Sequence, residues 1–129
     1  MQIFSDLIAG LSLKHPRIRF THMISHEAIA FLDVWLQNDV RCLQTSVFQK
    51  PTDRNNSLLY SSFHPMSLKR HLQFSQFLRL CRITSDQSGV QGIIGKFKDR
   101  YIHRGYPLEV LTKTEERALS YTREELLAM

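Results

Sequence analysis

The sequence predicts an α+β fold, in which an N-terminal helix and a small antiparallel β-hairpin or sheet precede an all-α bundle of helices. Two observations predict it. Between residues 17 and 49, apolar residues alternate with polar ones or form short runs, which is typical of strands. From residue 66 onward, apolar residues recur at helical spacing between residues that start and stop helices. We therefore divide the chain into residues 1–57 and residues 58–129.

The N-terminal helix is expected over residues 2–13, which Pro16 follows. Its apolar residues recur at the spacing of one helix face: Ile3, Leu7, Ile8 and Leu11. Residues 17–23 alternate polar and apolar, which predicts a half-buried strand.

A β-hairpin is expected over residues 28–49. The nearly continuous apolar run over residues 28–36 predicts a strand buried on both faces. Residues 41–49 alternate and predict its partner, and Asn38-Asp39 is a turn signal between them. Residues 50–56 have the composition of a loop, and residues 58–60 are expected to be briefly extended.

The helical half is predicted to contain two short helices, over residues 66–72 and 74–84, followed by two longer ones. Ser85 is the expected N-cap of a helix over residues 86–103, which Gly105 and Pro107 terminate. Its apolar stripe consists of Val90, Ile94, Phe97 and Tyr101. Thr112 and Glu115 fit a capping box that opens a last helix over residues 113–127.

The net charge of +5 is distributed unevenly along the chain. Residues 1–49 are neutral, residues 50–104 carry a net charge of +7, and residues 105–129 carry −2. A basic segment within a folded chain is typical of a protein that binds a polyanion, although a solvated basic face gives the same count.

The candidate nucleic-acid-binding residues are the cations of this basic segment. Lys50 and Arg54 flank a Pro-Thr turn that can bring a cation and backbone amides to a phosphate. The others recur along the predicted helices and suit contact with a duplex backbone. They are Lys69, Arg70, Arg79, Arg82, Lys96, Arg100 and Arg104. Two alternatives to nucleic-acid binding remain. The turn at Lys50 and Arg54 can be a salt-bridged turn, and the basic helix faces can serve solubility alone.

Other kinds of site have little support in the sequence. Cys42 and Cys81 lie far apart in patterned segments and are expected to be buried free thiols. The histidines show no metal-ligand spacing, so no metal or other cofactor is expected in this chain. The chain has neither an apolar run long enough for a membrane span nor the pattern of a signal peptide, so no membrane partner is expected.

Catalysis by the chain itself is not expected. Polymerase chemistry requires carboxylates that hold two divalent ions, and this sequence has no Asp-Asp pair. Asp33 lies in the middle of an apolar run, where an aspartate usually bonds to backbone or to an arginine. We therefore assign it no catalytic role.

Several strings, in this order and spacing, resemble the reverse transcriptases of Penelope-like retroelements. They are Phe31-Leu32-Asp33-Val34, the run from Thr45 to Asn55, Ser61-Ser62-Phe63-His64-Pro65, Ser75-Gln76-Phe77-Leu78-Arg79, and Arg104-Gly105-Tyr106-Pro107. The resemblance covers residues 3 to 110. The sequence departs from the family pattern at Gln73, where the family has proline, and in its glycine-rich third helix.

The resemblance implies that residues 1–57 are the C-terminal part of a palm and residues 58–129 a thumb, also described as a helix-turn-helix-like domain. It places the catalytic Tyr-x-Asp-Asp motif and its Mg²⁺ ions in an upstream part of a parent enzyme, an RNA-directed DNA polymerase. The implied partners are a DNA or RNA template–primer duplex and the upstream palm and fingers of the parent polypeptide. The implied location is intracellular, and nuclear if the chain follows the parent element.

The leading hypothesis is thus a non-catalytic fragment of a retrotransposon reverse transcriptase that contacts the nucleic-acid backbone through a basic loop and the thumb helices. A stand-alone helix-turn-helix-like DNA-binding module and a decayed element copy with no function remain the alternatives.

Overall fold

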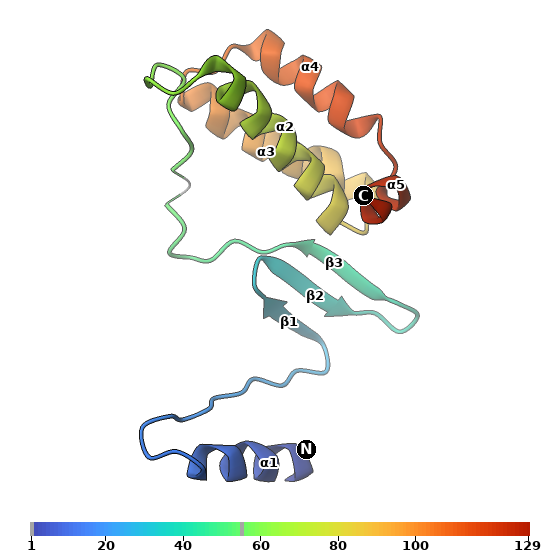
Figure 1. Ribbon diagram of the computed structural model, residues 1–129. Helices are drawn as coiled ribbons and strands as arrows, with labels where there is room; N and C mark the ends of the chain where they lie inside the picture. Colours follow the sequence, from blue (N-terminus) through green and yellow to red (C-terminus); the bar gives the residue numbers. More distant parts are fainter. Residues whose placement is uncertain (1, 55) are drawn as a thin grey trace.

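The computed structural model describes residues 2–54 and 56–129 and has the α+β architecture predicted from the sequence (Figure 1). One three-stranded antiparallel sheet, with strands in the order β1-β2-β3, lies between an N-terminal helix and a bundle of helices. The elements are α1 (Gln2–Leu13), β1 (Ala28–Phe31), β2 (Val34–Asn38), β3 (Leu43–Val47), α2 (Met66–Ile83), α3 (Gln87–His103), α4 (Leu108–Leu119) and α5 (Arg123–Ala128).

The apolar run over residues 28–36 is two strands, so the prediction of one continuous strand is wrong. Phe31 of β1 pairs with Val34 of β2, and Leu32 and Asp33 form a two-residue turn between them. Leu32 has a φ of 56°, which is the left-handed conformation that such tight hairpin turns require. The hairpin predicted from the turn signal at Asn38-Asp39 is confirmed as β2 and β3.

The helix at the N-terminus is confirmed, but α1 contributes nothing to the core. None of its described side chains is buried, and it lies apart from the sheet and the bundle in Figure 1. The strand predicted over residues 17–23 is wrong. These residues are exposed and pair with no strand in the described part of the chain. No sheet therefore covers the apolar side chains of the alternating pattern. Residues 58–60 are likewise not a strand.

The two short helices predicted before and after Gln73 are one continuous helix, α2. Glutamine is a good helix former, so nothing at this position interrupts the backbone hydrogen bonds. The Gln73 side chain is completely buried, and it points into the same interior as Phe77 and Leu80.

The third helix begins one residue later than predicted. Its N-cap is Asp86, whose side chain accepts a hydrogen bond from Ser88 N at 3.0 Å. Ser85 instead joins the bundle to the sheet, because its Oγ accepts from Thr45 N at 2.9 Å. The predicted end is confirmed, since Gly105 has a φ of 84° just beyond His103.

The capping box is ten residues further along than predicted. Thr112 lies within α4, which begins directly after Pro107. The capping box forms between Thr122 and Glu125 at the start of α5. The helix predicted over residues 113–127 is therefore two helices. The Thr122 backbone and side-chain hydrogen bonds lower the pKa of the Glu125 carboxyl.

The core lies within the helical bundle, around α2. Its buried apolar residues come from all four helices of the bundle and from the loop before α4: Phe77, Leu80, Cys81, Val90, Ile94, Tyr101, Tyr106, Leu111, Ala118 and Leu126. Both cysteines are free, as predicted, but only Cys81 is buried and Cys42 is exposed. None of the helices in residues 2–54 and 56–129 is long and apolar enough to cross a membrane.

Candidate nucleic-acid interface

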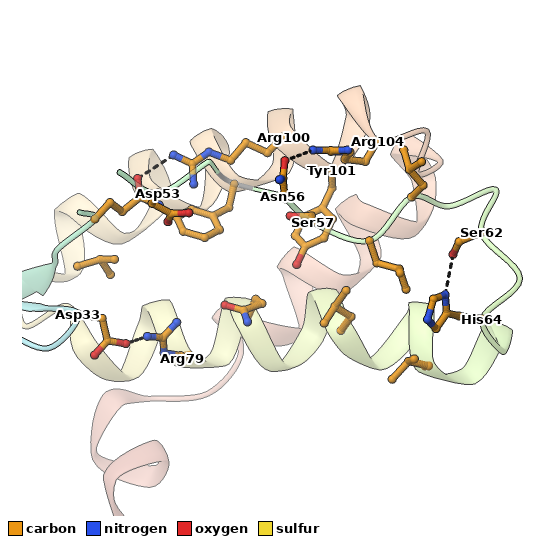
Figure 2. Close-up of a pocket in the computed structure, with 18 of the residues that line it drawn as sticks. Asp33, Asp53, Asn56, Ser57, Ser62, His64, Arg79, Arg100, Tyr101 and Arg104 are labelled. Carbon is orange, nitrogen blue, oxygen red and sulfur yellow. Dashed lines mark hydrogen bonds and ion pairs between the residues drawn. The ribbon is translucent and has the colours of Figure 1, made fainter. Parts of the chain in front are cut away.

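A groove of about 870 Å³ lies between α2 and α3, and the segment that connects β3 to α2 covers part of it. Figure 2 shows its lining side chains. α2 contributes Leu68, Leu72, Gln76 and Arg79, α3 contributes Phe97, Arg100 and Tyr101, and Arg104 is the C-cap residue of α3. The three arginines in this lining are all predicted binding residues, and we call the site the arginine groove.

Helical periodicity brings these side chains together. Residues at intervals of three and four share one side of a helix, as Gln76 and Arg79 do on α2. On α3 the same spacing places Phe97, Arg100 and Arg104 on one side. This is the side of α3 that faces the covering segment, because Arg104 O accepts a hydrogen bond from Tyr60 N at 3.0 Å.

Each arginine of the groove contacts a polar side chain from the first half of the chain (Figure 2). Arg79 forms an ion pair with Asp33. Arg100 Nη2 donates to Gln49 Oε1 at 2.7 Å, and its guanidinium lies 4.6 Å from the centre of the Phe97 ring. A guanidinium has five N–H donors, so each of these contacts leaves donors for a further anion.

Arg104 completes this row of contacts at the end of α3. Its Nη2 donates to Asn56 Oδ1 at 2.7 Å. Gln49 and Asn56 accept through neutral amide oxygens, so these two hydrogen bonds bring no negative charge to Arg100 and Arg104.

The groove also contains two carboxylates, those of Asp33 and Asp53. Its formal charge is therefore +1, from three arginines and two aspartates. The Asp33 and Arg79 side chains remain 42% and 44% exposed, and ion pairs that are this accessible to water are weak. The Arg79 guanidinium is therefore held only weakly by Asp33.

Tyr101 forms part of the groove wall and stays uncharged at neutral pH. Burial raises the pKa of its hydroxyl to about 12, and the nearby Tyr106 adds to the shift. The positive potential of the groove is thus set by its arginines and aspartates.

The structure places the other predicted binding residues outside the arginine groove, with one correction. Lys50 and Arg54 are exposed in the segment after β3, and Lys50 lines a smaller hollow together with Leu32 and Asp33. Three further predicted binding residues are exposed on α2 and α3 but do not line the groove: Arg70, Arg82 and Lys96.

Lys69 is the correction, because it is only 4% exposed. Its Nζ donates to Tyr60 O and to Ser62 O, each at 2.5 Å, and lies 5.5 Å from the centre of the Tyr60 ring. An ammonium satisfied in this way is not available to a phosphate. Lys69 instead fixes the loop that precedes α2.

Sequence reasoning missed Gln49 and Asn56, because an amide at a loop position gives no indication of which distant guanidinium it meets. It also missed two cations of the last helices. Arg117 lies 4.2 Å from the centre of the Phe74 ring, and Arg123 Nε donates to Arg82 O at 3.2 Å. Both lie in the segment with a net negative charge, so the charge count did not single them out.

In the described part of the chain, short connections of three or four residues, as in helix-turn-helix motifs, join the helices of the bundle. Residues 84–86 join α2 to α3, residues 104–107, which include Gly105, join α3 to α4, and residues 120–122 join α4 to the short α5. The helix after the second turn, α4, contains three glutamates and two cations. One of its glutamates, Glu115, binds Lys98 of α3 at 2.6 Å. A helix with this charge is poorly suited to enter a DNA groove.

Residues 56–115 match the family model of the animal helix-turn-helix domain. The match begins in the segment that covers the arginine groove, includes α2 and α3, and ends within α4. The matched segment therefore lies almost wholly in the helical half of the chain. No curated protein and no solved structure matches the chain. In the part of the chain that the structure describes, no three His, Cys, Asp or Glu side chains are grouped so as to hold a metal ion.

Proposed function

We propose that the helix-turn-helix domain binds a nucleic-acid duplex through the phosphate backbone, and that the arginine groove is the contact surface. The observation that carries this proposal is the convergence of Arg79, Arg100 and Arg104 on one groove. Arginine presents planar donor pairs that match the oxygens of a phosphate.

The charge distribution supports the same proposal. The segment from residue 50 to residue 104, with its net charge of +7, contains α2, α3 and the covering segment. Backbone contacts of this kind carry no base information. The acidic character of α4 argues against α4 as a helix that reads bases in a DNA groove.

The test is the affinity of the purified chain for a short blunt DNA duplex and for an RNA–DNA hybrid, measured by fluorescence anisotropy at about 50 and about 200 mM salt. We expect binding at the lower concentration that weakens steeply at the higher one, because phosphate contacts release counterions. No binding to either duplex at low salt would overturn the proposal.

A stand-alone DNA-binding module that recognises a base sequence is the second candidate, and the family match favours it. Such a module would present one helix to the major groove, and selection from a random duplex library would recover a common sequence motif. Backbone-directed binding predicts that the library returns no motif.

A narrower proposal is that the domain serves a Penelope-like reverse transcriptase as its thumb, together with an upstream palm and fingers. Five strings of the sequence in register support it, as described above. On this proposal the parent enzyme works inside the cell, in the nucleus, and holds its Mg²⁺ ions outside this chain. The chain by itself is not an enzyme, so it should not extend a primed template with Mg²⁺ present. Extension would contradict this proposal.

The last alternative is that the chain comes from a decayed copy of a retroelement and has no function. The glycines of α3 were the reason to consider it. That alternative predicts a purified chain without stable helices. A far-ultraviolet circular dichroism spectrum of a helical protein, with a cooperative thermal transition, would count against it.

A further inference from the structure

The loop before α2 exposes an aromatic side chain completely. Phe63 has a relative exposure of 109%, the highest of the large apolar residues described. Its neighbours in sequence are polar, within the string Ser61-Ser62-Phe63-His64-Pro65. A phenylalanine in this position adds nothing to the core and exposes a large apolar area to water.

The loop that carries Phe63 is firmly held. The buried Lys69 ammonium binds the carbonyl oxygens of Tyr60 and Ser62, which lie on the N-terminal side of Phe63. Ser62 Oγ and His64 Nδ1 are 3.2 Å apart, so the two residues that flank Phe63 contact each other. A buried cation is costly unless it is fully bonded, and here its bonds fix the shape of an exposed loop.

The loop lies at one end of the arginine groove. Ser62 and His64 both belong to the groove lining. In Figure 2 they lie at the opposite end from Asp33 and Arg79, and Arg104 lies between. Tyr60 N also donates to Arg104 O at 3.0 Å, which ties the loop to the end of α3. A backbone that follows the three arginines would therefore end beside Phe63.

We propose that Phe63 stacks on an unpaired nucleobase at the end of a duplex whose backbone occupies the arginine groove. The inference rests on the proposed function of that groove. Every base has a π face, so an aromatic side chain can stack on it without sequence preference. Phenylalanine on a fixed loop loses little conformational entropy when it stacks, since it has only two side-chain torsions. The preferred ligand is therefore a duplex with a single-stranded overhang.

The test compares a blunt duplex with the same duplex carrying a few unpaired nucleotides at its 3′ or its 5′ end, by fluorescence anisotropy at low salt. The wild-type chain should bind one of the two overhang ligands about tenfold more tightly than the blunt duplex. Phe63→Ala should lose this preference and keep the affinity for the blunt duplex, and Phe63→Trp should retain the preference. Because Phe63 is outside the core, neither substitution should unfold the chain.

A second readout reports on stacking directly. A 2-aminopurine base in the preferred overhang should lose fluorescence when Phe63→Trp binds, because a stacked indole quenches it by electron transfer, and should keep it with Phe63→Ala. Equal affinity for blunt and overhang ligands, or an overhang preference that survives Phe63→Ala, would overturn the inference while leaving the groove proposal intact. A chain that binds none of the ligands at low salt would overturn both.

Discussion

Arg79 of α2 forms an ion pair with Asp33, which lies in the tight turn between β1 and β2. The pair joins residues that are distant in sequence and links the sheet to the helical bundle. It also places a carboxylate on one of the three guanidinium groups that we assign to nucleic-acid binding. On the proposed function, Asp33 competes with the nucleic-acid phosphates for Arg79.

Asp33→Asn should therefore tighten binding. The substitution removes the carboxylate and frees Arg79, so we expect roughly a threefold gain in affinity for a blunt duplex at low salt. The free energy of unfolding should fall by less than about 1 kcal/mol, because both side chains are over a third exposed. Asp39→Asn, in the β2–β3 turn, is the matched control for the change in net charge. Equal effects of the two substitutions, or weaker binding by Asp33→Asn, would show that Asp33 does not compete.

The glycines of α3 should be replaceable with a gain in stability. A Cβ added at Gly92 or Gly95 meets no atom within 4 Å, so alanine fits there without strain. Each replacement should raise the free energy of unfolding by about 0.5–1 kcal/mol, through higher helix propensity. Gly105→Ala should have the opposite sign, because Gly105 has a φ of +84°. Chemical denaturation gives the free energy of unfolding of each of the three variants. A Gly92→Ala variant that is less stable than the wild-type chain would contradict the prediction.

Gln73 should be a source of instability in the core. Within the described part of the chain, neither its Nε2 nor its Oε1 has a hydrogen-bond partner, although the side chain is fully buried. Gln73→Met keeps the shape and removes both polar groups, so the free energy of unfolding should rise by about 1–2 kcal/mol. Gln76→Met, on the half-buried groove wall, should change it less. A lower stability of Gln73→Met would show that the amide is satisfied in solution.

The two thiols should differ sharply in reactivity. Cys42 is exposed, whereas Cys81 is buried and burial raises the pKa of its thiol. A raised pKa means less thiolate at about pH 8, and the thiolate is the reactive form. An aromatic disulfide reagent should titrate one thiol rapidly in the folded chain and the second only after denaturant is added. Rapid reaction of both thiols, or of the Cys42→Ser variant, would contradict the buried position of Cys81.

The sequence predicted the elements whose signals are local. Val90, Ile94 and Tyr101 of the predicted apolar stripe are buried, and its fourth member, Phe97, is half-buried against them. Gly105 has the positive φ expected of a residue that ends a helix. One failure came where the same local signal occurs twice. The Thr-x-x-Glu pattern occurs twice, at Thr112 and at Thr122, and only the position after the end of α4 can form a cap.

The candidate site was predictable in part. The charge count identified the segment that contains all three arginines of the groove, but spacing could not tell the exposed Arg79 from the buried Lys69. That distinction depends on where the Tyr60 and Ser62 carbonyl groups lie, which is a property of the folded loop. The pairing of Asp33 with an arginine was anticipated from its place in an apolar run, although not which arginine. The partners Gln49 and Asn56 were undetectable for the same reason as the contacts of Lys69.

The central claim is that the arginine groove is the nucleic-acid contact surface. Its most direct test compares two triple variants with the same loss of charge, each first shown to be folded by circular dichroism. The groove variant carries glutamine in place of Arg79, Arg100 and Arg104. The other variant carries glutamine in place of Arg70, Arg82 and Lys96. The measurement is the dependence of duplex affinity on salt concentration. For the groove variant, we predict that the slope of log affinity against log salt concentration becomes smaller by roughly two to three units, and that most of the binding at low salt is lost. The other variant should lose much less of both. Equal losses in the two variants, or a greater loss in the second, would contradict the claim.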